Sequence, residues 1–125
     1  VSTHIKDGGV LLGEDGLTVF PIETGRGIVD IQGIVDRLQQ LDRPINLSVE
    51  DHGGSFALHI HDPGFLKKFP HLSVEEFSLL IRLAFRSRRK HALGLKDITT
   101  RPMWPAVCEE RIRKDIEALK ILVNP

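Results

Sequence analysis

Residues 28–50, IVDIQGIVDRLQQLDRPINLSVE, predict a helix that leads directly into a strand. Asp30 is a favourable N-cap, and the residues after it place an apolar side chain every three or four positions: Ile31, Ile34, Val35, Leu38 and Leu41. Asp42-Arg43-Pro44 ends this helix, because the residue before a proline disfavours helical backbone angles. Residues 45–49 then predict a strand that stops at Glu50.

A second short strand is predicted at the start of the chain, over residues 1–5, which stops at Lys6-Asp7-Gly8-Gly9. Residues 10–24 are expected to form a long ordered loop, with a small hairpin whose second arm is residues 17–20. The order strand, loop, helix, strand defines a βαβ unit, in which the two strands pair in parallel. Only two or three strands are predicted in all.

The second half of the chain is predicted to be helical. Ser73 and Glu76 form a capping box, and Leu72 can pack against Phe77 at the same helix start. One face of this helix is apolar: Phe77, Leu80, Ile81, Ala84 and Phe85. A basic stretch at 86–91 closes it, and a connector at 94–105 leads to a last helix from Pro105. The apolar stripe predicted for that helix is Cys108, Ile112, Ile116, Leu119 and Val123.

Composition narrows the class of protein. The chain has 125 residues, 41% hydrophobic, with 17 basic and 17 acidic side chains and a formal net charge of zero. Net electrostatics therefore would not hold it to nucleic acid or to an anionic membrane. Cys108 is the only cysteine, which excludes an intrachain disulfide and favours a reducing, cytoplasmic setting. We expect neither a targeting segment nor a membrane span.

His4 and Glu50 are the side chains whose positions suggest chemistry. Each lies at or near the carboxyl end of a predicted parallel strand, and ligands of parallel α/β folds bind at that edge. An imidazole and a carboxylate there would suit Mn²⁺, Mg²⁺, Co²⁺ or Zn²⁺. The competing interpretation is a surface histidine beside a solvated or salt-bridged glutamate.

The order of several motifs resembles the C-terminal part of the xylose isomerase-like sugar phosphate isomerase/epimerase superfamily. In that family an H-x-K-D strand end precedes a G-x-G-x-(V/I)-D segment, a helix and a strand closing on Glu. The matching stretches here are His4-Ile5-Lys6-Asp7, residues 24–30 and Leu47-Ser48-Val49-Glu50. The resemblance implies an α/β fold: the last βα units of a partial (β/α)8 TIM barrel, with a C-terminal helical extension. Residues 1–54 would be the barrel part and 55–125 a loop insertion and helical extension.

The resemblance also implies roles for these residues. His4 matches a metal ligand on the seventh barrel strand, and Glu50 matches a ligand on the eighth that can act in proton transfer. The implied activity is metal-dependent isomerisation or epimerisation of a sugar, sugar phosphate or cyclitol in carbohydrate metabolism. The family's other two ligands come from earlier strands. The chain, which starts inside a predicted strand without Met, is therefore expected to be a fragment, inactive alone.

Three more residues are candidates for substrate binding. Lys6 follows His4, and with Asp7 it would either orient the substrate and the histidine or form a surface salt bridge. Arg26, between Gly25 and Gly27, could clamp a substrate phosphate or carboxylate, or lie in solvent. His52 stands two positions after Glu50, on the same edge.

Other functions compete with this one. The same scaffold supports dehydratases of polyhydroxylated rings or sugar acids, and a DNA-repair endonuclease ranks below these because the chain has no net positive charge. A non-catalytic half-barrel would form a homo-oligomer or associate with the missing half. The basic stretch 86–91 would either bind nucleic acid or another anion, or be a solvated helix end. A second metal site could be formed by residues near the middle of the chain: Asp51, His52, His59, His61, Asp62 and His71. The competing interpretation is that these histidines are surface residues.

Overall fold

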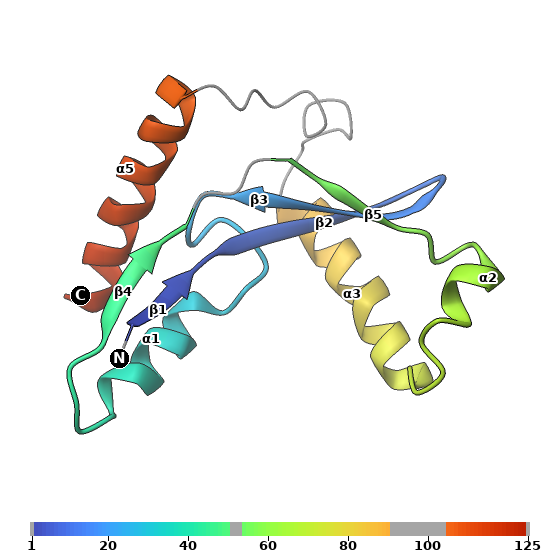
Figure 1. Cartoon of the computed structure of the whole chain (residues 1–125), viewed down its shortest axis with the longest axis horizontal. Helices are drawn as coiled ribbons and strands as arrows, with labels where there is room; N and C mark the ends of the chain where they lie inside the picture. Colours follow the sequence, from blue (N-terminus) through green and yellow to red (C-terminus); the bar gives the residue numbers. More distant parts are fainter. Residues whose placement is uncertain (1, 51–53, 91–104, 125) are drawn as a thin grey trace.

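The computed structural model describes residues 2–50, 54–90 and 105–124 (Figure 1). It is a mixed α/β structure with a two-stranded and a three-stranded sheet. The strands are β1 (Ser2–Ile5), β2 (Asp7–Gly13), β3 (Gly16–Ile22), β4 (Asn46–Val49) and β5 (Phe56–Leu58). The helices are α1 (Ile31–Gln39), α2 (Pro63–Leu66), α3 (Val74–Lys90) and α5 (Pro105–Val123). The described part thus has five strands, more than the sequence predicted.

The predicted βαβ unit is present. β1 and β4 pair in parallel, with His4 opposite Ser48 and Ile5 opposite Val49. Helix α1 connects them, and its predicted N-cap is confirmed because the Asp30 carboxylate accepts a hydrogen bond from the Gly33 amide at 3.1 Å. One core cluster joins this sheet to both neighbouring helices: Ile5, Ile31, Val35 and Leu119.

The interpretation of residues 10–24 as mostly loop is wrong. β2 and β3 form a long antiparallel hairpin, paired from Asp7 opposite Ile22 to Gly13 opposite Gly16, and β5 adds to β3. Its glycines and Pro21 are residues that strands usually avoid. Gly9 fits because the ring of Phe20 fills the space that a Cβ atom would occupy.

Helix α3 covers the hairpin. Its capping box is confirmed: the Ser73 amide donates to Glu76 at 2.8 Å, and the Glu76 amide donates to Ser73 Oγ at 3.1 Å. Phe77, Leu80, Ile81 and Ala84 share one face of the helix, as predicted, and the structure packs that face against Val10 and Leu17. Phe85 was wrongly assigned to this face, since it is 53% exposed. The inner face continues instead at Ser87, whose hydroxyl accepts from the Val10 amide.

Helix α5 begins at Pro105 as predicted, but part of its predicted stripe is wrong. Ile116 is 41% exposed, whereas Arg111 and Asp115 are buried about two turns and one turn before Leu119, respectively. The helix is turned so that Asp115 reaches the backbone of residue 24. The inward face of α5 therefore combines a buried polar contact with the apolar packing of Leu119.

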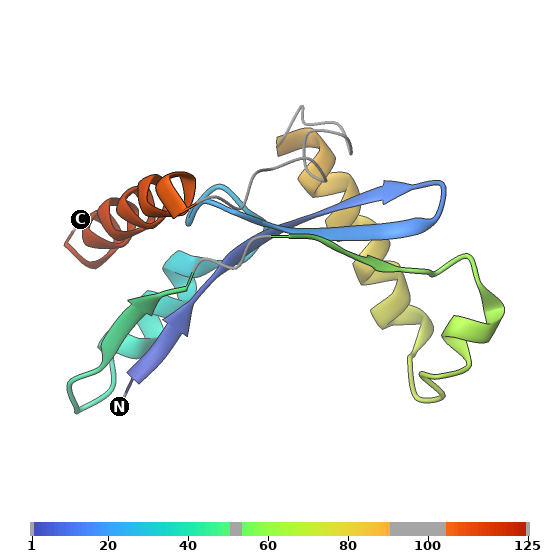
Figure 2. The same cartoon turned by 45° about the horizontal axis from the view of Figure 1, so that its top comes forward.

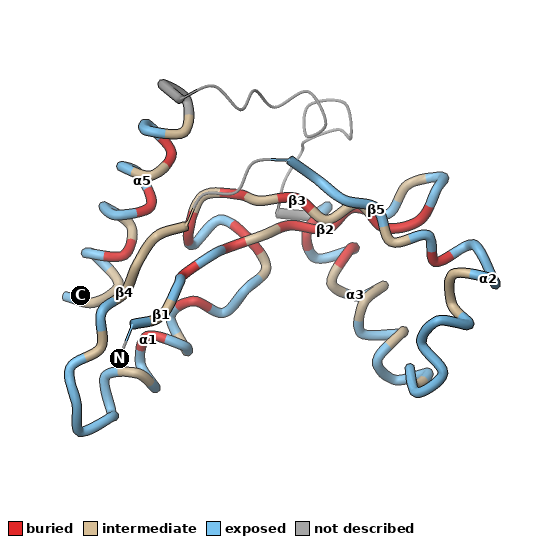
Figure 3. Tube along the Cα trace, in the orientation of Figure 1, coloured by how far each residue is buried: buried red, intermediate tan, exposed pale blue. Residues whose placement is uncertain are grey.

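The two sheets meet end to end. β1 runs through Lys6 into β2, so one stretch of chain pairs with β4 at one end and with β3 at the other (Figure 2). Buried residues follow β2, β3 and the inner sides of α1, α3 and α5 (Figure 3). The connector predicted at 94–105 lies almost wholly outside the described residues. No helix within the described ranges is long and apolar enough to cross a membrane.

Leu17 tests whether the hairpin and α3 form a real core. Its side chain is 1% exposed and packs with Val10, Ile60 and Ala84. We expect Leu17→Ala to lower the free energy of unfolding by about 2–5 kcal/mol, through lost burial and the cavity left behind. Its cross-strand neighbour Leu12, which is 43% exposed, is the matched control, and Leu12→Ala should cost less than about 1 kcal/mol in urea unfolding. Equal losses would contradict this packing.

Candidate functional site

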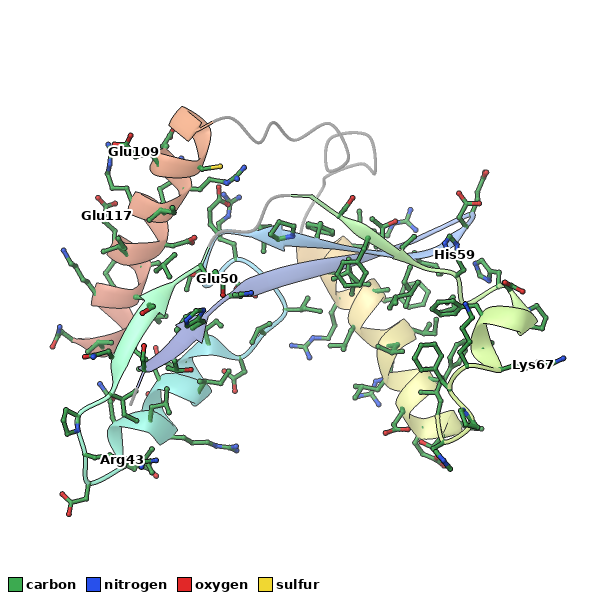
Figure 4. The ribbon with its side chains drawn as sticks, in the orientation of Figure 1. Arg43, Glu50, His59, Lys67, Glu109 and Glu117 are labelled. Carbon is green, nitrogen blue, oxygen red and sulfur yellow. The ribbon has the colours of Figure 1, made fainter. Side chains whose placement is uncertain are left out.

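The site lies where the chain passes from one sheet to the other. β1 ends at Ile5 and β4 at Val49, and the Glu50 amide continues the pairing by donating to the Ile5 carbonyl at 3.4 Å. The strands are parallel, so His4 and Glu50 lie at the same edge. Figure 4 shows Glu50 at the end of β4, close to the point where β1 becomes β2.

His4, Lys6 and Glu50 come together as the strand positions predicted. His4 Nδ1 lies 2.6 Å from Glu50 Oε2, and Lys6 Nζ lies 2.9 Å from the same oxygen. His4 and Lys6 are two positions apart in an extended chain, so both side chains leave it on the same side. One carboxylate oxygen therefore faces a cation and an imidazole, both of which remain largely accessible to solvent.

The two predicted ligands suit a metal only as part of a larger set. His4 Nδ1 and Glu50 Oε2 are hydrogen-bonded at 2.6 Å. They would have to separate before both bound one ion, because ligand atoms about 2.0–2.2 Å from a tetrahedral ion lie roughly 3.4 Å apart. Lys6 competes for that oxygen. In the part of the chain that the structure describes, no three or more His, Cys, Asp or Glu side chains are grouped to hold a metal. Further ligands would have to come from elsewhere.

Asp7 is buried, so it does not form the surface salt bridge that one interpretation gave it. It is 6% exposed, and its carboxylate accepts hydrogen bonds from four backbone amides. Oδ1 accepts from Gly8 at 2.8 Å and Val29 at 3.2 Å; Oδ2 accepts from Gly25 at 2.9 Å and Gly27 at 2.8 Å. A carboxylate satisfied in this way holds the loop of residues 24–29 against the start of β2.

The two loop glycines are needed for different reasons. Gly25 has φ of +83°, a left-handed conformation that side chains with a Cβ rarely adopt. At Gly27, a Cβ atom would overlap the Asp7 carboxylate. From the other side, Asp115 of α5 accepts a hydrogen bond from the Thr24 amide at 2.6 Å, and this contact is buried. Sequence reasoning missed Asp115, because an apolar-stripe search ignores carboxylates.

A small cavity adjoins these groups. Its volume is about 70 Å³, and Lys6, Thr24 and Glu50 line it together with the two buried carboxylates Asp7 and Asp115. The cavity therefore joins the proposed ligand Glu50 to the loop that Asp7 holds. Ile5, Pro21 and Ile22 complete the lining, and the volume is sufficient for an ordered water beside the polar groups.

The other candidate residues are placed apart from this group or lie outside the description. Arg26 pairs with Glu23 at 3.1 Å and points largely into solvent, which agrees with the solvated alternative. His52 and Asp51 lie outside the described residues, as do the side chains at 89–91. His59 and His61 are exposed on either side of buried Ile60, in a turn and not a strand. The ring of His59 meets the edge of Phe65, with centroids 5.9 Å apart.

The resolved pKa shifts lie on the outer side of α5. A hydrogen bond from Lys114 to Glu110, at 2.8 Å, lowers the pKa of Glu110 and raises the pKa of Lys114. Both groups are fully exposed one helical turn apart, as is usual for a surface ion pair. We assign them no role in the site.

No protein-family model, curated protein or solved structure matches this chain.

Gly27 tests the contact between Asp7 and the loop. We expect Gly27→Ala to destabilise the fold by about 2–4 kcal/mol, since the new methyl group must displace a buried carboxylate or its partners. Gly25→Ala, where nothing lies within 4 Å of a Cβ, should cost only about 1–2 kcal/mol for its backbone angle. Thermal and urea unfolding of both variants measure the difference. A smaller loss for Gly27→Ala than for Gly25→Ala would contradict the close contact.

Proposed function

We propose that this chain is part of a metal-dependent isomerase or epimerase acting on a sugar, sugar phosphate or cyclitol. The observation that supports the proposal is the convergence of His4 Nδ1 and Glu50 Oε2 to 2.6 Å at the carboxyl ends of two parallel strands. Such an edge is the usual position of ligands in parallel α/β folds. In this proposal the strands belong to the last units of a (β/α)8 barrel and the compartment is the cytoplasm.

Each residue type suits the proposed reaction. Moving a proton on the carbon next to a carbonyl needs a base, and Glu50 is the carboxylate available for it. His4 and Glu50 would hold a divalent ion, Mn²⁺, Mg²⁺, Co²⁺ or Zn²⁺, which supplies polarisation of the carbonyl and hydroxyl oxygens. Lys6, already 2.9 Å from Glu50, is placed to donate to a substrate oxygen beside that base.

Arg26 and His52 complete the proposal for the substrate. The side chain of Arg26 projects from an exposed turn. Its guanidinium would release Glu23 and bind an anionic group of the substrate instead. His52, two positions after Glu50 in sequence, is proposed to bind a substrate hydroxyl. Together with Lys6 these groups would favour a polyhydroxylated, oxygen-rich substrate.

Metal binding by the full-length protein tests this proposal. We expect wild type to bind Mn²⁺ with a stoichiometry of about one in isothermal titration calorimetry. His4→Ala and Glu50→Gln should each weaken that binding by roughly 100-fold or more, because loss of even a supporting residue costs about 10–100-fold. His59→Ala and His61→Ala are matched controls on exposed histidines away from the site and should bind as wild type does.

Turnover provides the second readout of the same variants. His4→Ala and Glu50→Gln should lose aldose–ketose or epimer interconversion measured by NMR, whereas the two control variants should retain it. An unchanged Mn²⁺ affinity in His4→Ala would contradict the assignment of these residues as ligands.

A second candidate function is a half-barrel that associates with another chain. An apolar groove of about 390 Å³ lies between β4 and α5, lined by Leu47, Val49, Ile116, Leu119 and Val123 among others. Within the described residues, β1 and β4 pair only with each other, and unpaired strand edges favour association. Both features are what a sheet lacking neighbouring strands would present.

Light scattering on residues 1–125 tests this association. We expect a mass above the 14.0 kDa of one chain, decreasing towards one chain on dilution. Leu47→Lys places a charge in the groove and should shift the chain towards monomer, while Leu12→Lys, on the far hairpin, should not. A monomer at every concentration would contradict association through this face.

A further inference from the structure

We propose that Asp7 and Asp115 are positioning residues that hold the loop of residues 24–29 as one wall of the Glu50 site. Through them the docking of α5 sets the geometry of that site. The inference depends on the proposed function only where it concerns metal affinity. The arrangement of the loop, Lys6 and Glu50 is independent of that function, because it follows from contacts within the chain.

The loop is held from two sides by carboxylates of distant elements. Asp7, at the start of β2, accepts from Gly25, Gly27 and Val29 as well as from Gly8. Asp115, on α5, accepts from the Thr24 amide 91 positions earlier in the chain. Both carboxylates are buried, at 6% and 7% exposure. Buried carboxylates are costly unless hydrogen-bonded, so these contacts are strongly constraining.

The held loop is adjacent to the site. Thr24 lines the same small cavity as Lys6 and Glu50. Asp7 directly follows Lys6, so the amides that fix Asp7 also fix the backbone from which Lys6 reaches Glu50 at 2.9 Å. The amide of Ile28 adds a further bond, to the Gly8 carbonyl at 2.8 Å. Release of the loop would therefore free Lys6 and open the cavity beside Glu50.

The two carboxylates respond differently to the same isosteric substitution. In Asp115→Asn an amide oxygen can still accept from Thr24, whereas Asp115→Leu removes the acceptor. In Asp7→Asn one oxygen is replaced by an NH2 group that faces two amide donors, so half of the contacts are lost. A conservative rescue is thus available at Asp115 and is not available at Asp7.

The experiment uses the full-length protein with three readouts. Amide hydrogen exchange at Gly25, Gly27 and Val29 reports the loop, the ¹⁵N shift of His4 Nδ1 reports its contact with Glu50, and calorimetry reports Mn²⁺ affinity. We expect Asp7→Asn and Asp115→Leu to speed exchange at the loop at least tenfold, move the His4 signal and weaken Mn²⁺ binding about tenfold. Asp115→Asn, which keeps an acceptor for the Thr24 amide, should lie closer to wild type than Asp115→Leu in all three readouts.

Leu17→Ala is the control for a general loss of stability. Leu17 lies in the hairpin–α3 core and lines no part of the cavity beside Glu50, so this variant should leave the His4 signal unchanged. If loop exchange is unaltered in Asp7→Asn and Asp115→Leu, the carboxylates do not hold the loop. If exchange rises but the His4 signal stays constant, they stabilise the fold without positioning the site. Absence of Mn²⁺ binding in wild type would overturn the proposed function alone, because the His4 signal still decides the positioning role.

Discussion

The buried carboxylate of Asp7 is the constraint on which the middle of this structure depends. Its two oxygens accept hydrogen bonds from four backbone amides, which belong to two separate stretches of chain. Removal of these partners would leave a charge in a poorly hydrated position, at a penalty of several kcal/mol. The loop therefore passes so close to this carboxylate that Gly27 has no room for a Cβ atom. Gly25, whose amide also donates to Asp7, takes a positive φ in the same loop.

The same point in the chain is where two sheets join. Up to Ile5 the chain pairs in parallel with β4, and from Asp7 it pairs antiparallel with β3. Lys6 stands between the two sheets, so its side chain leaves the backbone at the edge where the parallel strands end. Because α5 packs on the parallel sheet and α3 on the hairpin, two cores are built on one continuous stretch. The site lies at their boundary.

Periodicity and capping rules predicted much of this fold. α1 with its Asp30 cap, the capping box at Ser73 and the start of α5 each depend on local signals that a sequence carries fully. The parallel register then brought His4 and Glu50 together as expected. The hairpin was predicted too short, with residues 17–20 as its second arm. Gly8, Gly9, Gly13 and Pro21 are poor strand formers in isolation, and only cross-strand packing shows why they fit. The inward face of α5 was missed since buried polar residues such as Asp115 carry no hydrophobic signal.

The contacts of Glu50 limit what chemistry the group can perform. Lys6 and His4 share one carboxylate oxygen, and an ion held by His4 and Glu50 would have to displace the ammonium from it. In the proposed function that displacement is useful, since a lysine released from Glu50 can turn to a substrate oxygen while staying within reach of the base. Such an exchange requires the side chain of Lys6 to move while its backbone stays in place. The amides that bind Asp7, the next residue, hold that backbone. A rigid loop beside an exchangeable ion pair is thus consistent with a site that loads a cation and then an oxygen-rich substrate.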